Sequence, residues 1–271
     1  MNLKQELAAD TANTLHTRNL ICLDETGSTN EDLAQMAAQG CPEWTIVTAE
    51  MQTDGKGRRG RSWHSPKGTS LSFSLLLRPA FSPDKASMLT LLMAMAVWDG
   101  IKGLCGEDTH FEERIKIKWP NDIVIDKKKV CGILTGMRVE GTQIDNVIIG
   151  VGININQDAF PDEIKDMATS LNLALGMKCQ KAMLLERITE AFQSYYETFL
   201  QEENLLFLKD AYERRLINRG EEVQVLDPQN PYTGIAVGIT EQGELLVEDE
   251  SKNIRTVYAG EVSVRGLYGY V

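Results

Sequence analysis

One short segment of the sequence concentrates positive charge in a chain that is otherwise acidic. Residues 55–63 read GKGRRGRSW and carry four basic side chains, whereas the whole chain has a formal charge of −11. Arginine offers planar donors suited to phosphate and carboxylate oxygens, and glycines let the backbone present N–H groups inward. The segment therefore predicts an anion-binding loop, although a solvated basic turn or an RGG-like nucleic-acid segment also fits its composition. It contains neither the P-loop pattern GxxxxGK[ST] nor the Rossmann pattern GxGxxG.

A second motif, KIKWPND at residues 116–122, ends a predicted strand with polar side chains. Alternating isoleucine and lysine predict the strand, which delivers Lys118, and Pro120 then forces the chain out of register. Asn121 and Asp122 therefore lie at a strand end, where ligands are usually met. An Asn-Asp pair after proline is also common in turns, so the motif alone leaves both interpretations open.

Two further motifs place lysine or glycine against a buried strand. The lysines at 127–129 occupy a predicted hairpin tip, where lysine is usually only solvated. Lys129, however, leads directly into the buried arm, and Gly132 leaves space beside it for a ligand. Gly150 and Gly152 interrupt another strand and would allow a ligand or another backbone to approach closely.

The sequence STNE at residues 28–31 marks the start of a predicted helix. Ser28 and Glu31 have the spacing of a capping box, which is a purely structural explanation. A helix start also offers free N–H groups and hydroxyls to a small polar ligand, and the two roles are compatible.

Hydrophobic periodicity and turn residues predict the elements that position these motifs. Strands are expected at 20–23, 44–49, 71–77, 115–119, 123–125, 130–139 and 147–155, and helices at 29–38, 82–103 and 181–215, the last broken near Asn204. Residues 51–70 are expected to form a long loop rich in glycine and arginine. After Gly220, short strands separated by turn residues predict a small β-barrel-like unit. We therefore expect one domain over residues 1–216 and a second over 217–271.

The composition argues against several classes of protein. With 42% hydrophobic and 25% charged residues, the 271-residue chain has the balance of a soluble globular protein. We expect no membrane-spanning helix, because no apolar run approaches ~18 residues. Five scattered cysteines without a CxxC pair argue against a disulfide framework or zinc site and for a cytoplasmic location. Three histidines form no cluster with a nucleophile, so a Ser-His-Asp hydrolase is not expected, and the negative charge counts against a general DNA binder.

In this order, the motifs resemble the biotin protein ligase family. The family pattern is STN, then Q-x-x-G-R-G-R-x-G-R with W-x-S-P-x-G, then K-W-P-N-D, K-x-x-G-I-L and G-x-G-I-N. It matches this sequence at 28–30, 52–61, 63–68, 118–122, 129–134 and 150–154. The chain departs from the pattern at Lys56, where the family often has arginine. Lysine keeps the charge but lacks the planar guanidinium that donates two parallel hydrogen bonds.

The resemblance implies an α/β (α+β) fold of the class II aminoacyl-tRNA synthetase-like type. A mixed, mostly antiparallel sheet flanked by helices would be followed by a small SH3-like β-barrel. About 20 residues precede the first predicted strand, too few for the helix-turn-helix domain of some members, so the monofunctional type is expected.

The implied activity is ATP-dependent biotin ligation in two steps. Biotin and ATP would give biotinyl-5′-AMP and pyrophosphate, with Mg²⁺ carried by ATP rather than held by protein ligands. Biotin would then pass to a lysine of a biotin carboxyl carrier domain, such as that of acetyl-CoA carboxylase. No DNA or membrane partner is expected, and a homodimer is left open.

The resemblance also implies roles for individual residues. Arg58, Arg61, Lys118 and Lys129, together with Mg²⁺, would offset the charge of two anions that must react, and Asp122 would orient or deprotonate the acceptor lysine. The residues implied to bind biotin and the adenylate are Ser28, Thr29, Asn30, Gln52, Gly55, Lys56, Gly57, Arg58, Arg61, Trp63, Asn121, Lys129, Gly132, Gly152 and Asn154. Among these, Trp63 and Asn154 would lie near the adenine and Asn121 near the phosphates.

Two other functions are weighed against this one. A lipoate or octanoate ligase of the same superfamily would share the fold, but residues 52–61 and KWPND favour biotin. A nucleic-acid-binding module using the arginine-rich loop would require a basic surface, which the net charge opposes.

Overall fold

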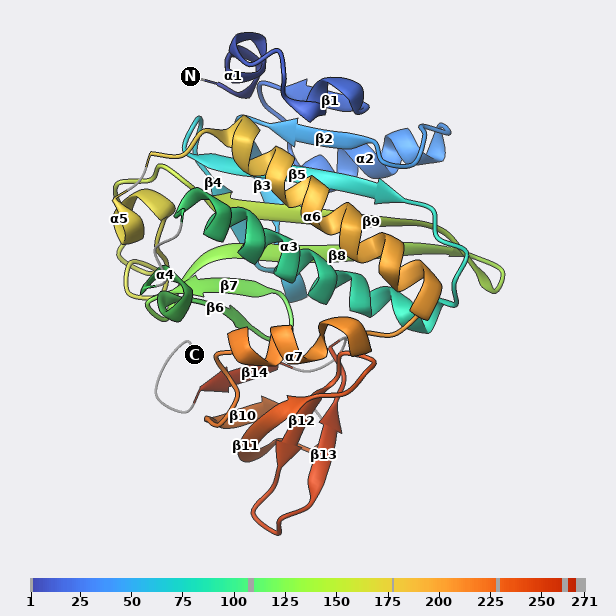
Figure 1. Cartoon of the computed structure of the whole chain (residues 1–271), viewed down its shortest axis with the longest axis vertical. Helices are drawn as coiled ribbons and strands as arrows, with labels where there is room; N and C mark the ends of the chain where they lie inside the picture. Colours follow the sequence, from blue (N-terminus) through green and yellow to red (C-terminus); the bar gives the residue numbers. More distant parts are fainter. Residues whose placement is uncertain (1, 107–109, 177, 228–229, 260–262, 267–271) are drawn as a thin grey trace.

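A seven-stranded mixed sheet carries the motifs (Figure 1). The computed structural model describes residues 2–106, 110–176, 178–227, 230–259 and 263–266. In spatial order the strands are β1 (Leu20–Leu23), β2 (Ile46–Ala49), β5 (Ser70–Leu77), β9 (Gln143–Asn154), β8 (Lys128–Glu140), β7 (Asp122–Ile125) and β6 (Ile115–Lys118). Only β1 and β2 pair in parallel, so the prediction of a mixed, mostly antiparallel sheet is confirmed.

The two faces of this sheet differ in chemistry. The main hydrophobic core includes Phe73 and Leu75 of β5 together with α3 (Met88–Leu104) and α6 (Lys181–Glu202), which pack against each other. Helix α2 (Thr29–Ala38) packs in a separate cluster with Leu76 and its neighbours. Because successive strand side chains point to opposite faces, the serines of β5 lie on the α2 face. This face therefore has polar side chains and space to accept a ligand.

The segment Pro83–Leu104 corrects one expectation. It comprises η3 (Pro83–Ser87) and α3, and by length and composition it is apolar enough to cross a membrane. The expectation that no such run exists is therefore wrong. In the structure 72% of its most apolar window is buried inside the protein, where α3 packs on α6 and the sheet. This is the environment of a core helix.

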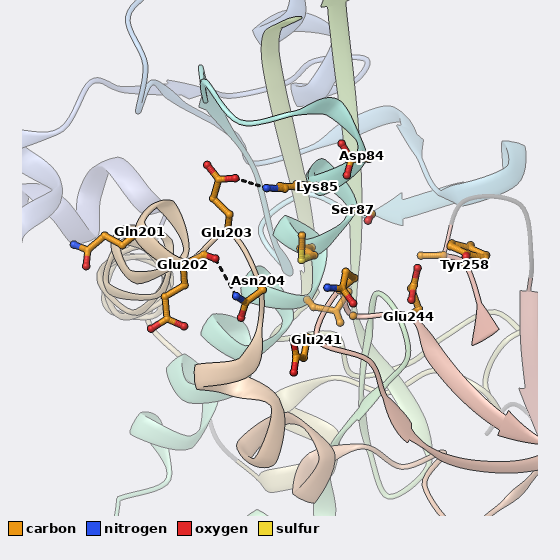
Figure 2. Close-up of a pocket in the computed structure, with 15 residues that line it drawn as sticks. Asp84, Lys85, Ser87, Gln201, Glu202, Glu203, Asn204, Glu241, Glu244 and Tyr258 are labelled. Atoms are coloured by element: carbon orange, nitrogen blue, oxygen red, sulfur yellow. Dashed lines mark hydrogen bonds and ion pairs between the residues drawn. The ribbon is translucent and has the colours of Figure 1, made fainter. Parts of the chain in front are cut away.

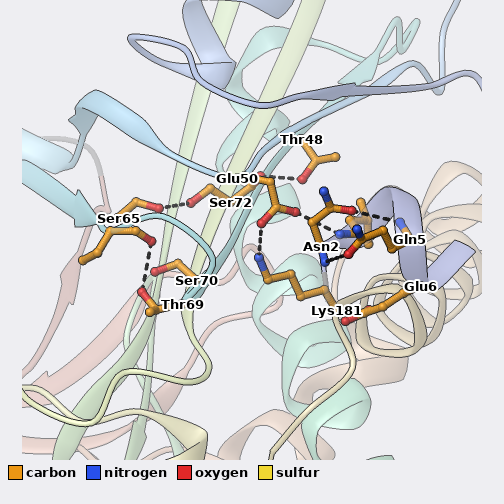
Figure 3. A network of polar contacts seen from close by, with 12 residues as sticks. Asn2, Gln5, Glu6, Thr48, Glu50, Ser65, Thr69, Ser70, Ser72 and Lys181 are labelled. Atoms are coloured by element: carbon orange, nitrogen blue, oxygen red, sulfur yellow. Dashed lines mark hydrogen bonds and ion pairs between the residues drawn. The ribbon is translucent and has the colours of Figure 1, made fainter.

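The N-terminal segment, for which the sequence predicts no element, is tied to the core. It forms α1 (Leu3–Ala9) and η1 (Thr14–Thr17). Glu50 accepts a hydrogen bond from the Leu3 backbone at 2.9 Å and binds the buried Lys181 ammonium at 2.6 Å (Figure 3). Because Glu50 directly follows β2, this network fixes the chain just before the arginine-rich segment.

The arginine-rich segment is more regular than the predicted loop. It folds as a hairpin of β3 (Gln52–Lys56) and β4 (Ser62–Ser65), joined by η2 (Arg58–Gly60). The short helices α4 (His110–Arg114) and α5 (Leu171–Leu175) were also not predicted. The predicted break near Asn204 is confirmed, because α6 ends at Glu202 and α7 (Leu206–Arg215) follows.

A smaller antiparallel sheet follows α7. Its strands, in the spatial order β13-β12-β11-β10-β14, are β13 (Ile254–Val257), β12 (Leu245–Glu248), β11 (Tyr232–Ile239), β10 (Glu222–Leu226) and β14 (Ser263–Gly266). Two hydrogen bonds connect Trp119 to the C-terminal part of the chain, which contains the small sheet. The Trp119 backbone donates to the Asn218 side chain, and its indole donates to the carbonyl of Gly243 at 2.9 Å. The small sheet is therefore anchored to the KWPND motif.

Candidate functional site

A pocket on the α2 face of the large sheet brings most of the predicted residues together. Its lining contains Ser28, Thr29, Asn30, Gln52, Lys56, Gly57, Arg58, Trp63, Asn121, Lys129, Gly132 and Gly152 of the predicted set, together with Ile133, Leu134, Gly150 and Val151. Segments from α2, the β3–β4 hairpin and the central strands thus meet at one place. Figure 1 shows α2 and the β3–β4 hairpin behind the large sheet, on the face opposite α3 and α6.

The floor of the pocket consists of paired glycines. Gly132 of β8 pairs with Gly152 of β9, and Gly150 lies opposite Leu134. A Cβ atom on Gly152 would lie 2.4 Å from the Trp63 ring, and one on Gly150 would lie 2.1 Å from Asn30 Oδ1. The glycines therefore make room for two side chains of the site, whereas the sequence analysis expected a ligand or another backbone to approach them.

The start of α2 is not capped as predicted. Ser28 is the N-cap residue, but its side chain makes no capping hydrogen bond, so the capping-box prediction is wrong. Instead, Gln52 Oε1 accepts hydrogen bonds from the backbone and hydroxyl of Thr29 at 2.9 and 3.1 Å. A residue of the hairpin thus binds the helix terminus, and this links the hairpin position to α2.

Ser74 is a site residue that the sequence interpretation missed. Its hydroxyl is buried and lies 2.7 Å from Thr29 Oγ1 and 2.5 Å from Asn30 Oδ1. It therefore fixes both polar side chains at the pocket. A sequence pattern could have identified Ser74, because Ser70, Ser72 and Ser74 alternate with apolar residues along β5 and so share one face of the strand.

Lys129 enters the pocket because of a β-bulge. Gly132 pairs with Asp122, whereas Lys129 pairs with Val124, so the register shifts by one residue between them. In a regular strand, positions 129 and 132 would point to opposite faces, and the extra residue brings them to the same face. The Lys129 ammonium accordingly lies 3.0 Å from the position of a Gly132 Cβ and 2.7 Å from Asp122 Oδ1.

Arg58 supplies a second cation at the same end of the pocket. Its guanidinium donates to Asn121 Oδ1 at 2.9 Å and to the backbone carbonyl of Ala259, which follows strand β13 of the small sheet. Burial lowers the pKa of Arg58 below its ordinary value, as do the nearby Arg59 and Arg61, while Asp122 opposes that shift. Arg58 remains charged, and its partial desolvation strengthens its attraction for an anion.

Trp63 fills much of the pocket. Its ring lies against Gly152 and 5.6 Å from the Lys129 ammonium. In the described part of the chain, the indole Nε1 is buried with no hydrogen-bond partner. About 50 Å³ of free space remains, far below the ~300–1,000 Å³ of a typical small-molecule site. A ligand can enter only if Trp63 or the hairpin moves.

Five predicted residues do not line the pocket. Asp122 lies beside the pocket, where it forms an ion pair with Lys129. Lys118 of β6 is buried and is paired with Asp122 of β7 in the sheet register. Gly55 packs under Trp63, and Arg61 is exposed. Asn154 is turned to structural partners: its amide donates to the Thr169 carbonyl at 3.1 Å and its oxygen accepts from Gln157. The structure therefore does not bring Asn154 to the ligand space.

A larger cleft, of about 820 Å³, lies between α3, the end of α6 and the β11–β12 turn (Figure 2). The charged residues of its lining are mainly acidic: Asp84, Glu202, Glu203, Glu241 and Glu244 stand against Lys85. Such a surface repels carboxylates and phosphates. The smaller pocket with Arg58 and Lys129 is therefore the candidate site for anionic ligands.

The described residues offer neither a reactive thiol nor a metal cluster at this pocket. Burial raises the pKa of the Cys131 thiol far above its usual range. Among these residues, no group of three His, Cys, Asp or Glu side chains is arranged to hold a metal ion. The chemistry of the pocket therefore rests on its cations, amides and Asp122.

A substitution in the pocket floor tests this geometry. Gly150→Ala should raise the Kd for the ligand about tenfold, because the new Cβ displaces Asn30 from its position beside Ser74. Gly136→Ala on β8 is the matched control, since a Cβ there meets nothing within 4 Å. Calorimetric titration with biotin, the ligand that the sequence resemblance implies, gives the Kd of each variant. Thermal unfolding shows whether either substitution changes stability. Equal affinities for the two variants would contradict the assigned floor.

The sequence and fold match known proteins. Residues 23–154 match the Biotin/lipoate A/B protein ligase family, and residues 220–265 match the Biotin protein ligase C terminal domain. The chain is 38% identical over 249 residues to the "Bifunctional ligase/repressor BirA" of Bacillus spizizenii, covering 91% of this chain and 74% of that protein. It is 30% identical to the "Biotin--[acetyl-CoA-carboxylase] ligase" of Mycobacterium tuberculosis, covering 90% and 88%.

A solved structure agrees over nearly the whole fold. The biotin protein ligase of Aquifex aeolicus in complex with biotin and ATP superposes with a TM-score of 0.73 at 33% identity. The match covers 92% of this chain and 99% of that one.

Proposed function

The chain belongs to the biotin protein ligase family and is an enzyme that uses biotin and ATP, and we propose that its pocket performs both steps of biotin transfer. One observation carries this assignment. Two cations, Arg58 and Lys129, line the same pocket as the polar groups of Ser28, Asn30 and Gln52, with Lys129 beside Gly132 and Asn30 beside Gly150 of the glycine floor. An elongated ligand with a polar ring and a terminal carboxylate fits this distribution.

In the first step, a biotin carboxylate oxygen attacks the α-phosphorus of ATP. A carbon–oxygen–phosphorus anhydride forms, the bond from the α-phosphorus to the bridging oxygen breaks, and pyrophosphate leaves with the electron pair. Both reactants are anions, so their approach is opposed by charge. Arg58 and Lys129 offset this repulsion where it develops, and Lys118 adds positive charge at longer range.

Mg²⁺ enters this step as part of the ATP complex. No carboxylate is among the described residues that line the pocket, and Asp122, which lies beside it, is paired with Lys129. Oxygen ligands from the triphosphate and water suit Mg²⁺, which is commonly held by one or two carboxylates plus substrate phosphates. The ion supplies charge neutralisation on the phosphates, while this chain's residues position the carboxylate.

In the second step, an acceptor lysine attacks the carbonyl carbon of the adenylate. The new carbon–nitrogen bond replaces the bond to the phosphate oxygen, and AMP leaves with the electron pair. The incoming ammonium loses one proton before attack and a second afterwards. Asp122, at the end of β7, is placed to orient the ammonium and accept a proton before passing it to water.

The acid substrate is tested by pyrophosphate release. We expect release to require biotin and ATP, with lipoate or octanoate giving little, because the polar cluster of Asn30, Ser74 and Gln52 has no partner on an acyl chain. Faster release with lipoate or octanoate than with biotin would assign the chain to the alternative specificity.

Three wider assignments accompany this proposal. The acceptor is a biotin carboxyl carrier domain, such as that of acetyl-CoA carboxylase, which the M. tuberculosis relative's name supports. The enzyme acts in the cytoplasm and binds neither DNA nor membranes, consistent with five free thiols and a charge of −11. The domain boundary lies at 216/217, between α7 and β10.

The hairpin should respond to ligand. Residues 51–66 bear like charges around glycines, and an anion supplies the free energy that orders them in the closed position. Biotin with ATP should therefore protect Arg58, Arg59 and Arg61 from trypsin. Cleavage at the exposed turn around Lys252 serves as the internal control. Cleavage of 51–66 at the same rate with and without ligand would argue against this ordering.

A further inference from the structure

The Asp122–Lys129 ion pair places a carboxylate where the substrate's carboxylate must bind. Lys129 Nζ lies 2.7 Å from Asp122 Oδ1, and the two side chains are only 27% and 12% exposed. The same ammonium faces the Gly132 floor and the Trp63 ring. A second carboxylate cannot take the same position on Lys129 without displacing the first.

Asp122 also acts on the other cation of the site. Arg58 is close enough for Asp122 to oppose the fall in its pKa, and Arg58 donates to the adjacent Asn121. One carboxylate thus forms an ion pair with Lys129 and lies near Arg58, the other cation of the pocket. This arrangement keeps two partly desolvated cations compensated before a ligand arrives.

We propose that biotin binds by carboxylate exchange, in which its carboxylate takes Lys129 from Asp122. This inference rests on the proposed function. While paired with Lys129, Asp122 attracts an acceptor ammonium poorly, because its charge is already compensated. Once the ligand anion holds Lys129, the Asp122 carboxylate is released to receive the acceptor lysine. The exchange therefore makes Asp122 available for the second step only when the first substrate is in place, and it selects acids over neutral analogues.

A purely structural pair predicts the opposite effect of removing Asp122. If the pair only joins β7 to β8, then Asp122→Asn loosens Lys129 and weakens biotin binding. If Asp122 competes with the ligand, then Asp122→Asn frees Lys129, and biotin binds more tightly. The sign of the change separates the two cases.

Calorimetric titration of the full chain with biotin and with biotinol, which replaces the carboxylate by an alcohol, measures this sign. We expect Asp122→Asn to lower the Kd for biotin about three- to tenfold and to change that for biotinol less than twofold. Asp126→Asn is the matched control, because it removes the same charge just beyond the opposite end of β7, where Asp126 pairs with Arg114. It should leave both affinities unchanged.

The exchange also requires Lys129. In a Lys129→Met background, Asp122→Asn should no longer tighten biotin binding. Weaker or unchanged biotin binding by Asp122→Asn, equal tightening for biotinol, or tightening that persists with Lys129→Met would each overturn the exchange. Failure of the wild-type chain to bind biotin would instead refute the proposed function, so the two failures are distinguishable.

Discussion

Lys129→Ala should weaken biotin binding and slow adenylate formation about 30-fold or more, while Lys127→Ala and Lys128→Ala should be nearly silent. Losing one member of a desolvated charge pair costs on the order of 2–5 kcal/mol, and 1.4 kcal/mol corresponds to about tenfold. Lys129 lines the pocket and contacts Asp122. Lys127 is exposed at the turn, and Lys128, partly exposed, donates to the backbone carbonyl of Lys165. An exposed lysine contributes close to nothing.

Biotin titration and pyrophosphate release measure the two effects on all three variants. Similar behaviour of the three lysines, or a larger loss at Lys128, would show that Lys129 does not bind the carboxylate. Thermal unfolding should change little for Lys127→Ala and Lys128→Ala, whereas Lys129→Ala should lower the unfolding temperature, because it removes the ion pair of the nearly buried Asp122 carboxylate.

Arg58→Ala should slow adenylation about ten- to hundredfold and make the enzyme release its intermediate. A hydrogen bond to a charged group contributes roughly 1.5–3 kcal/mol. If the transition state of adenylation loses this stabilisation, the reaction slows about ten- to hundredfold. The release follows because Arg58 joins the hairpin to Asn121 and Ala259, so its loss opens the cover over a water-sensitive anhydride.

Labelling of bystander lysines by escaped biotinyl-adenylate reports the release, and single-turnover pyrophosphate formation reports the rate. Arg59→Ala is the control, since Arg59 is exposed on the same turn and does not line the pocket. It should alter both quantities less than twofold. Normal retention and rate in Arg58→Ala would remove Arg58 from the mechanism.

Much of the fold follows from local patterns in the sequence. Short apolar runs bounded by turn residues predict the central strands, alternation predicts the edge strand β6, and the break near Asn204 follows from residues that end a helix. The hairpin at 52–65 was not predicted, because its strands lack the apolar alternation that marks a strand and are stabilised by Gln52 and Trp63 packing on other elements.

The site could be predicted by residue type but not by geometry. Sequence spacing places Lys129 three residues before Gly132, and only the bulge, a property of pairing with β7, brings them to one face. The carbonyl of Ala259 reaches Arg58 across 201 positions of the chain, and no local pattern records such a contact. Asn154 is the last residue of the GVGIN motif and of β9. Its side-chain amide is hydrogen-bonded to Thr169 and Gln157, and the sequence motif does not reveal these partners.

Intact mass of a biotin carboxyl carrier domain after incubation with the enzyme, biotin and MgATP tests the central claim most directly. The account predicts a gain of one biotinyl group, lost when the acceptor lysine is replaced and sharply reduced with Lys129→Ala. A carrier domain that stays unmodified, or that gains a lipoyl or octanoyl group in preference to biotin when all three acids are supplied, would contradict it.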